Sequence, residues 1–539
     1  MDMLAARALR STRGDILLAA LLASVGSTVL VASVPPAGDA PAHLYRTLLV
    51  RQGVHVWDNL WYAGQYPLVS YSLLYYFPAA LVGNEPLVFV AVVVSAALFA
   101  ALVVGEWGEA GRWPARIFAL LAIGPLFTGT YSYAVGFATM LAALLALQRG
   151  RTWLGVVCAA LTLGFSPLAF VFLCVVLVAV ALGRREVGRR TIGVGIGLAV
   201  LAGLQLAALE AFPSEGRYPF RTLELAAVLT ACALGAALAV RAARGQVMLA
   251  FFAVWALVSV VGFLVPSPFG ENLTRLRVFL FPLMLLAAGL ARFRPRWLAL
   301  GACAFAFVYN VIPYAAVAAR VEARTSTREF WMPALAFLRR HSSPDFRVEV
   351  VPTFDHWEAY WVPRAGYALA RGWYRQLDIT ENGVLYRERL SPAAYRRWLR
   401  RMGVRFVLLP DAHLSSQGAN LEAVLLRSGR SGLARVFRSA DWAIYELRPA
   451  VPLLTGAAPA HINELSHERI EGAIAARGAY RLRVNYTRYW KVAAGKVCVA
   501  RAPDGMTVLR ARRGGRFALV LAERPLPLMA SALGRRPHC

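Results

Sequence analysis

One stretch of the chain organises the rest: residues 35–83 read PPAGDAPAHLYRTLLVRQGVHVWDNLWYAGQYPLVSYSLLYYFPAALVG. An apolar run at 15–34, long enough to cross a bilayer as a helix, comes directly before it. The stretch is the one long connector in an otherwise strongly apolar half, and such loops in compact domains are usually functional. It holds six tyrosines, two tryptophans and several charged side chains. We therefore expect the chemistry of the protein to lie here.

The first 320 residues predict a polytopic α-helical membrane domain. Hydrophobic residues make up 58% of the 539-residue chain, which argues against a purely soluble protein. Two apolar runs, on either side of Ser166-Pro167, are short, so we expect broken or tilted helices there. Together the apolar runs predict eleven spans, at 15–34, 86–105, 114–130, 132–148, 153–165, 168–183, 192–211, 223–240, 247–266, 275–291 and 297–317.

Basic residues predict how these spans are oriented. Three arginines precede the first run, which lacks a clean small-residue cleavage site, so we expect a retained span and a cytoplasmic N-terminus. With eleven spans, five arginine-bearing short connectors then all fall on the cytoplasmic side. These connectors hold Arg112 and Arg116, Arg149 and Arg151, Arg184 to Arg190, Arg241 and Arg244, and Arg292 to Arg296. The loop at 35–85 and everything after 320 are then expected outside the cytoplasmic (inner) membrane of a bacterium.

The net charge of +28 does not predict a nucleic-acid partner. Almost all the basic residues are arginines, and no nucleic-acid-binding motif accompanies them. In the apolar half they lie between spans, where they orient helices, so the bilayer is the expected partner.

The six cysteines show no metal-binding spacing. Four lie in apolar runs, where small buried thiols are ordinary. Cys498 and Cys539 lie beyond the spans and could pair. No zinc or haem site is expected from these positions.

Beyond residue 320 the pattern changes to shorter, more charged elements. Helical spacing at 328–341 and 392–402, with strand-like runs at 346–351 and 405–409, predicts an α/β domain over 321–450. Strict alternation from about 480 to 523 predicts a small antiparallel β-sandwich in a β-rich domain at 451–539.

Asp39, His43 and Asp58 are the first candidates for chemistry. Asp39 follows the first span by a few residues, and the neighbouring prolines stiffen the backbone and end the helix. His43 comes four residues later and shares a helix face with Asp39 if Pro41 begins a new helix. Asp39 could equally be a plain N-cap of that helix, and spacing alone leaves both interpretations open.

The order of these elements resembles bacterial membrane proteins described as 6-pyruvoyl-tetrahydropterin-synthase-related, whose architecture is similar to the GT-C superfamily of lipid-linked-sugar glycosyltransferases. The matching order is a first span, Gly-Asp-x-x-x-His-Leu, a basic helix, Trp-Asp-x-x-Trp-x-x-Gly-x-Tyr-Pro-Leu, an aromatic helix and a second span. Residues match over 35–85 and more loosely over 350–411. The paired acidic motif of protein mannosyltransferases is absent, because Ala40 follows Asp39.

The resemblance implies transfer of a sugar from a polyprenyl phosphate to an extracytoplasmic glycan, lipid or protein acceptor. Asp39 is then the expected general base. His43 and Asp58 would orient it, or Asp39 and Asp58 would hold a divalent cation such as Mg²⁺ or Mn²⁺. The lipid phosphate needs positive partners, for which the candidates are Arg46, Arg275 and Arg277, each of which could instead be an interfacial anchor. Glu271 is the second-choice carboxylate.

Two further groups are candidate substrate-binding residues. Aromatic and amide side chains of the loop would stack on a sugar or cradle a polyprenyl chain, or else form an aromatic belt at the headgroup level; they are Trp57, Trp61, Tyr62, Gln65 and Tyr66. Polar-aromatic clusters at 355–358 and 371–374 offer His356, Glu358 and Arg371 to an acceptor, or to an interface with the membrane domain.

Two other functions remain open from the sequence. One is a transporter or flippase for a lipid-linked glycan, although the spans are almost free of the ionisable relays that such proteins usually need. The other is a non-catalytic membrane scaffold whose outer domain binds a glycan or a partner.

Overall fold

The computed structural model describes residues 2–68, 71–185, 188–213 and 216–521, with side chains from residue 12 onward. The chain divides into two compact units. The first comprises Met1–His43, Tyr71–Glu210 and Gly216–Ala319. The second comprises Leu44–Ser70, Ala211–Glu215 and Arg320–Cys539. The 35–83 stretch is thus shared between the units, with one boundary within helix α2 (Ala40–Arg51) and a second between residues 70 and 71.

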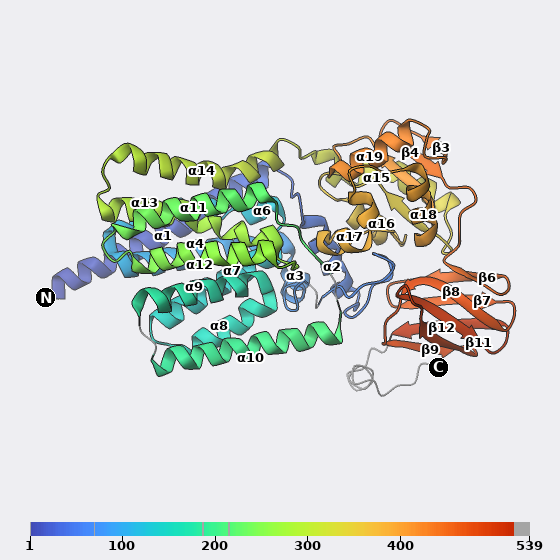
Figure 1. Cartoon of the computed structure of the whole chain (residues 1–539), viewed down its shortest axis with the longest axis horizontal. Coiled ribbons are helices and arrows are strands. Elements are labelled where there is room, and N and C mark those ends of the chain that lie inside the picture. The colour runs from blue at the N-terminus through green and yellow to red at the C-terminus, as the bar shows by residue number, and fades with distance from the viewer. Residues whose placement is uncertain (1, 69–70, 186–187, 214–215, 522–539) are drawn as a thin grey trace. The chain divides into compact units, whose positions relative to one another are not determined.

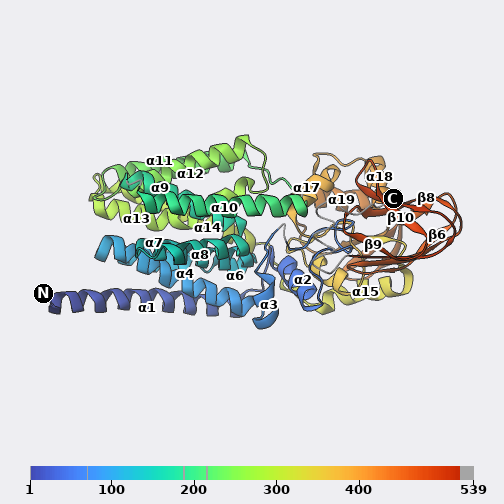
Figure 2. The same ribbon diagram turned by 90° about the horizontal axis from the view of Figure 1, so that it is seen from below.

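The first unit is a bundle of apolar helices whose axes run roughly parallel in both views (Figure 1, Figure 2). The main helices are α1 (Asp2–Ser33), α4 (Asn84–Trp107), α7 (Tyr131–Gln148), α8 (Thr152–Phe165), α9 (Pro167–Arg184), α10 (Arg189–Ala211), α11 (Thr222–Val240), α12 (Gln246–Leu264), α13 (Leu280–Ala291) and α14 (Arg296–Ala318). Short elements join them: α3 (Tyr76–Val82), η1 (Gly108–Gly111), α5 (Arg112–Leu121), α6 (Gly124–Thr128) and η2 (Gly270–Phe279).

Within the described residues, nine helical segments are long and apolar enough to cross a membrane. A multi-pass membrane protein is therefore confirmed, whereas the count of eleven spans is not. The expected runs at 86–105 and 114–130 fall in one helical segment, Asn84–Thr128, and the run at 153–165 becomes α8, which has only 14 residues. The orientation of the spans stays a prediction.

The outer surface of α10 shows why this unit needs a bilayer. No residue of α10 is buried, although the helix is 23 residues long and strongly apolar. Ile192, Ile196, Val200 and Leu204 are all more than half exposed. Such a continuous apolar face would be costly in water and is stable in hydrocarbon.

The expected break at Ser166-Pro167 is confirmed. Ser166 has an extended backbone, and its hydroxyl accepts a hydrogen bond from the Ala169 amide at 3.3 Å. Pro167 is the first residue of α9. A serine cap followed by proline at the first helical position ends one helix and starts the next.

The second unit contains a four-stranded mixed sheet in the order β1-β2-β4-β3. Strand β1 (Arg347–Val350) runs parallel to β2 (Val404–Pro410), and β4 (Trp442–Glu446) is antiparallel to both β2 and β3 (Ala434–Arg438). The accompanying helical elements are η3 (Ala323–Ser326), α15 (Arg328–His341), α16 (Glu358–Arg364), α17 (Arg375–Glu381), η4 (Gly383–Tyr386), α18 (Pro392–Met402) and α19 (Gln417–Arg427). The expected helices at 328–341 and 392–402 and strands at 346–351 and 405–409 are confirmed to within one or two residues.

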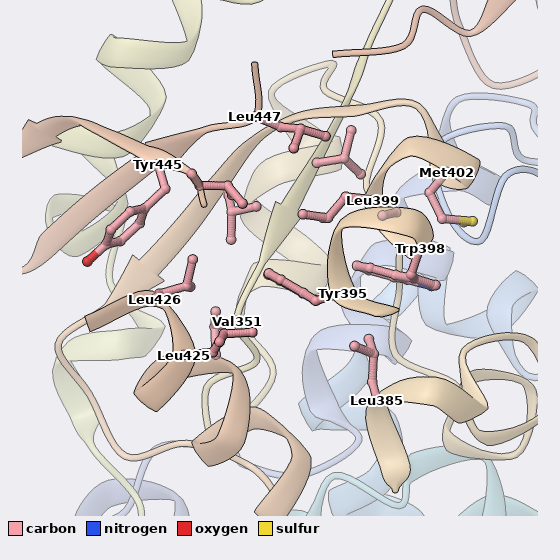
Figure 3. Packing of buried hydrophobic residues seen from close by; sticks show 14 of the residues in the cluster. Val351, Leu385, Tyr395, Trp398, Leu399, Met402, Leu425, Leu426, Tyr445 and Leu447 are labelled. Atoms are coloured by element: carbon pink, nitrogen blue, oxygen red, sulfur yellow. The ribbon is translucent and has the colours of Figure 1, made fainter. Parts of the chain in front are cut away.

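Helix α18 carries one face of the core of this α/β layer. Tyr395, Trp398 and Leu399 are buried on the same side and pack toward Val351 and Leu385 (Figure 3). Ser391 caps the helix start through the Ala394 amide at 3.2 Å, and Gly403, at φ +70°, ends it. Only glycine adopts that left-handed conformation without strain.

The end of the described chain forms two four-stranded antiparallel sheets, ordered β10-β11-β8-β5 and β6-β7-β12-β9, that share one hydrophobic cluster. The expected sandwich is present, but it begins earlier than residue 480, because β5 to β7 also belong to it. Cys498 lies in β10, whereas Cys539 lies outside the described residues. The strands are β5 (Leu454–Gly456), β6 (Ala460–Leu465), β7 (Arg469–Ile474), β8 (Gly478–Asn485), β9 (Trp490–Ala494), β10 (Val497–Arg501), β11 (Met506–Ala511) and β12 (Gly515–Leu521).

Candidate functional site

Asp39 stands immediately before α2, in the first unit. Its amide donates to the Thr128 carbonyl at 3.1 Å, and its carbonyl accepts from the His43 amide at 3.2 Å. The Asp39 side chain is one-quarter exposed. Its Oδ2 accepts a hydrogen bond from the Tyr71 hydroxyl at 3.3 Å and lies 4.0 Å from Nη2 of Arg275. Asp39 therefore has the N-cap position and, in addition, a cation beside its carboxylate.

Gly129 makes this placement possible. Its φ is +69°, and a Cβ added to it would lie 2.1 Å from the Ala40 amide nitrogen. No side chain fits there, so a glycine is required for the turn between α6 and α7 to approach the start of α2. That approach holds the Asp39 backbone against Thr128.

Arg275 and Arg277, both in η2, line a cavity of about 150 Å³ in the first unit. Arg277 is 3.3 Å from the Glu224 carboxylate, which also accepts a hydrogen bond from the Tyr309 hydroxyl at 2.8 Å. Arg275 lies over the Tyr133 ring, 5.8 Å from its centroid. The polar residues that line the cavity are Ser95, Thr128, Thr130, Tyr133, Arg275, Arg277 and Tyr314. The structure thus brings the two sequence-selected arginines to one cavity, and Asp39 lies beside one of them, Arg275.

His43 is buried among tyrosines of the same unit. Its Nδ1 lies 3.2 Å from the Tyr76 hydroxyl. Ring centroids of Tyr71, Tyr75, Tyr76 and Tyr131 lie 5.1 to 5.8 Å from its own. Since Tyr71 also donates to Asp39, His43 is linked to the carboxylate through that tyrosine. This arrangement fits a positioning residue.

Asp58 belongs to the second unit and is fully buried. Its Oδ1 accepts from the Leu60 amide at 3.0 Å and lies 2.9 Å from Nδ1 of His467, while Oδ2 accepts from the Tyr45 hydroxyl at 3.0 Å. Burial lowers the pKa of His467, but the hydrogen bond and the charge of Asp58 outweigh it, so the pKa of His467 is raised. The structure therefore does not bring Asp39, His43 and Asp58 together in one unit.

No metal site accompanies these carboxylates within the described ranges. There, no group of three or more His, Cys, Asp or Glu side chains is arranged to hold a metal ion. A divalent cation held by Asp39 and Asp58 stays a prediction.

The aromatic residues of the loop are buried inside the second unit. Trp61 stacks on Tyr45 with centroids 4.6 Å apart, and its Nε1 donates to the Ala359 carbonyl at 3.2 Å. Trp57 packs edge-on against Tyr66 at 4.8 Å. Tyr62 accepts from the Tyr374 amide at 3.0 Å. Packing against protein thus accounts for these side chains, and contact with a substrate stays a prediction.

Two further sequence-selected residues of this loop region are also buried. The Gln65 backbone pairs with that of Asp58 through two hydrogen bonds of 2.9 and 3.1 Å. Arg46 lies over the rings of Trp61 and Tyr374, 5.8 and 5.5 Å from their centroids. These are cation–π contacts that stabilise a buried guanidinium.

His356 and Glu358 meet in the α/β layer. His356 Nδ1 lies 3.0 Å from Glu358 Oε1, and the His356 ring stacks on Trp373. The other Glu358 oxygen accepts from the Thr353 hydroxyl at 2.7 Å. His356 has φ +59°, which is unusual for a non-glycine residue and occurs at strained, often functional positions. Burial raises the pKa of the neighbouring Asp355 to about 6.

Arg371 is the centre of a buried ionic cluster. Its guanidinium contacts the carboxylates of Glu349 and Glu422, the latter at 2.9 Å. Tyr395 donates to Glu422 at 2.6 Å. Both carboxylates are fully buried, and burial raises the pKa of Glu349. Glu271, the second-choice carboxylate, instead pairs with Arg221 at 2.9 Å in the first unit.

The sequence analysis missed Tyr71, Glu224 and His467. Glu224 lies in the first turn of α11, where an acidic residue is ordinary, so its position gave no distinct signal. Tyr71 was one of many tyrosines, and His467 lies in a turn between β6 and β7 with no local motif. Both residues matter through contacts with residues far away in the sequence, Asp39 for Tyr71 and Asp58 for His467.

Comparison with known proteins adds no relative. No protein-family model matches the chain. No curated protein matches it either.

Proposed function

We propose that this protein is an integral-membrane glycosyltransferase of GT-C type, which moves a sugar from a polyprenyl-phosphate donor to an extracytoplasmic acceptor. One observation carries the proposal: the Asp39 carboxylate lies 4.0 Å from Arg275, which lines a cavity together with Arg277. Transfer from a lipid phosphate requires a base and positive partners for the phosphate, and here a carboxylate lies beside one of two cations that line a cavity. The Gly-Asp-x-x-x-His-Leu resemblance assigns the base to the same aspartate.

The chemistry can be written with these residues. Asp39 takes the proton from the acceptor hydroxyl as its oxygen bonds to the anomeric carbon of the sugar. The bond from that carbon to the phosphate oxygen breaks, and the electron pair leaves with the lipid phosphate. Arg275 and Arg277 stabilise the charge that develops on this leaving group. The Glu224 carboxylate partly offsets the positive charge of Arg277. Arg275 therefore contributes more to stabilising the charge on the leaving lipid phosphate.

A second cavity supports a lipid-linked donor. It measures about 240 Å³, is lined mainly by aliphatic and aromatic residues, and lies along helices that also line the first cavity. In α4, Val92 and Ser95 line the first cavity, and Phe99 lies one turn beyond Ser95 and lines the second. In α7, Tyr133 lines the first cavity and Leu141 lines the second. This second, apolar cavity would accommodate an isoprenoid chain.

The decisive test is Asp39→Asn in the purified full-length protein, assayed with a panel of polyprenyl-phosphate sugars. Asparagine caps a helix as well as aspartate does, so this variant removes the base and keeps the cap. We expect transfer to fall by about 10²- to 10⁴-fold, the usual worth of a general base. Glu271→Gln is the matched control and should retain activity.

Other outcomes would select another function. Full activity in Asp39→Asn would remove this aspartate from the role of base. Movement of labelled lipid-linked sugar across proteoliposomes, without transfer, would indicate a transporter or flippase. Absence of both transfer and transport with every donor would favour a scaffold.

A further inference from the structure

A third cavity lies among α1, α4, α7 and α9 in the first unit, and it has a volume of about 460 Å³. In α4 it is lined by Gly105 and Glu106, about three turns beyond Ser95, which lines the cavity of Arg275 and Arg277. This third cavity therefore lies at the C-terminal end of α4, away from the proposed catalytic groups. The polar residues that line it are Thr12, Glu106, Gln148, Arg149 and Arg184.

The polar wall of this cavity carries more positive than negative charge. The Glu106 carboxylate lies 2.9 Å from Nη2 of Arg184 and accepts a hydrogen bond from the Gln148 side-chain amide at 3.3 Å. A second lining arginine, Arg149, makes no side-chain hydrogen bond or ion pair with any described residue. A third, Arg244, donates to the Glu106 carbonyl at 3.3 Å. One carboxylate thus lies among three arginines.

Two other acidic side chains described near this end of the bundle do not offset that excess. The Asp15 carboxylate, in α1, lies 2.9 Å from Nε of Arg112 and 3.4 Å from Nη2 of Arg116. The Glu109 carboxylate lies 3.0 Å from Nη1 of Arg112. These two carboxylates and two arginines neutralise one another, so an anion at the cavity would meet a net positive charge.

The polar cavity adjoins the apolar cavity of about 240 Å³, because Glu106, Gln148 and Arg184 line both. A ligand that fills the two cavities together needs an anionic group for the arginines and an apolar chain for the aliphatic wall. A free phosphate ion would use only the polar cavity. The isoprenoid chain of the proposed donor would use the same apolar cavity, so the two lipids should compete for it.

Exposed tryptophans indicate that this end of the bundle lies at the level of the lipid head groups. Trp113 and Trp153 each lie in the first turn of the helix that follows α4 or α7, and they are 65% and 72% exposed. Tryptophan concentrates at the membrane–water interface, and basic pockets between spanning helices bind anionic head groups. We infer that the third cavity binds the phosphate of an anionic phospholipid, whose acyl chain enters the adjoining apolar cavity.

The test is lipid binding to the full-length protein in detergent, measured by native mass spectrometry and by thermal unfolding. Dioleoyl-phosphatidylglycerol is compared with dioleoyl-phosphatidylcholine, which has the same chains and a phosphate but no net charge, and with sodium phosphate. We expect phosphatidylglycerol to bind at least about fivefold more tightly than phosphatidylcholine and to raise the unfolding temperature more than phosphate does. No sugar donor is present, so the result does not depend on the proposed transferase activity.

Two variants change the cavity in different ways. Gly105→Leu fills it without changing its charge; the atoms nearest to a Cβ there belong to the Gln148 amide, at 3.8 and 3.9 Å, and leucine favours a helix more than glycine does. Arg149→Gln removes the unpaired charge. Each variant should weaken phosphatidylglycerol binding by at least about fivefold. Arg296→Gln, at an exposed arginine in the first turn of α14 that does not line the cavity, is the control and should bind as the parent does.

Four results would each overturn the inference. Equal binding of phosphatidylglycerol and phosphatidylcholine would exclude recognition of an anionic head group. Stabilisation by sodium phosphate as large as that by the lipid would indicate a site for the free ion. Unchanged binding in Arg149→Gln, whose exposed side chain is not needed for folding, would exclude this cavity even if Gly105→Leu does not fold. An equal loss in Arg296→Gln would indicate a general effect of surface charge.

Discussion

Asp39 and Asp58 come from the same short stretch of sequence, yet their surroundings differ. Asp39 is one-quarter exposed, and its carboxylate lies beside an arginine that lines a cavity. Asp58 has no exposed surface, and its two oxygens contact Leu60, Tyr45 and His467. A partly exposed carboxylate can exchange a proton with a substrate, whereas a buried and fully bonded one holds the chain in place. Burial and partners therefore distinguish the two where residue type does not.

The largest effect that would separate the two aspartates is on stability. Asp58→Ala leaves three buried donors without their acceptor, and we expect it to lower the free energy of unfolding by about 3–5 kcal/mol. Asp39→Ala loses mainly a helix cap, worth about 0.5–2 kcal/mol. Urea unfolding of the full-length protein, followed by tryptophan fluorescence, measures both. Equal losses in the two variants would contradict the comparison.

The next effect concerns the cations at the cavity. Arg275→Gln removes a charge-assisted hydrogen bond to the lipid phosphate and should lower kcat/KM for the donor by about 10- to 100-fold. Arg277→Gln should lower it less, because Glu224 already offsets the charge of Arg277. Steady-state kinetics at fixed acceptor concentration tests both variants. Arg221→Gln is the control, and a similar loss there would point to a general charge effect instead of phosphate binding.

The smallest effect is a pH dependence around Asp58. The pKa of His467 is raised in the folded protein, so the folded state binds this proton more tightly than the unfolded state. The resulting stabilisation is complete below the unfolded pKa of about 6.5 and is lost as pH rises through the higher, folded value. Unfolding midpoints between about pH 5 and pH 8 should show this loss.

A variant pair isolates that contribution. His467→Gln should flatten the pH dependence, because it removes the titrating group. His461→Gln, at an exposed histidine of β6, should leave it intact. An unchanged pH profile in His467→Gln would show that other groups cause it.

Local patterns in the sequence predicted much of the architecture. Continuous apolar runs predicted the long helices, and alternation after residue 480 predicted the last strands of the sandwich. Strand β6 was missed because its exposed residues do not alternate regularly with buried ones. The count of eleven spans is not confirmed, because Asn84–Thr128 counts as one candidate span although it contains both α4 and α5, and α8 has only 14 residues.

The sequence by itself determined which segments are helices or strands and which short stretch holds the acidic residues, since both depend on neighbours along the chain. Only the tertiary structure decided that Asp39 meets Arg275, that Asp58 meets His467, and that Arg371 lies between Glu349 and Glu422. Those pairings join residues far apart in the chain. They depend on which helices and strands pack together, and periodicity carries no information about that choice.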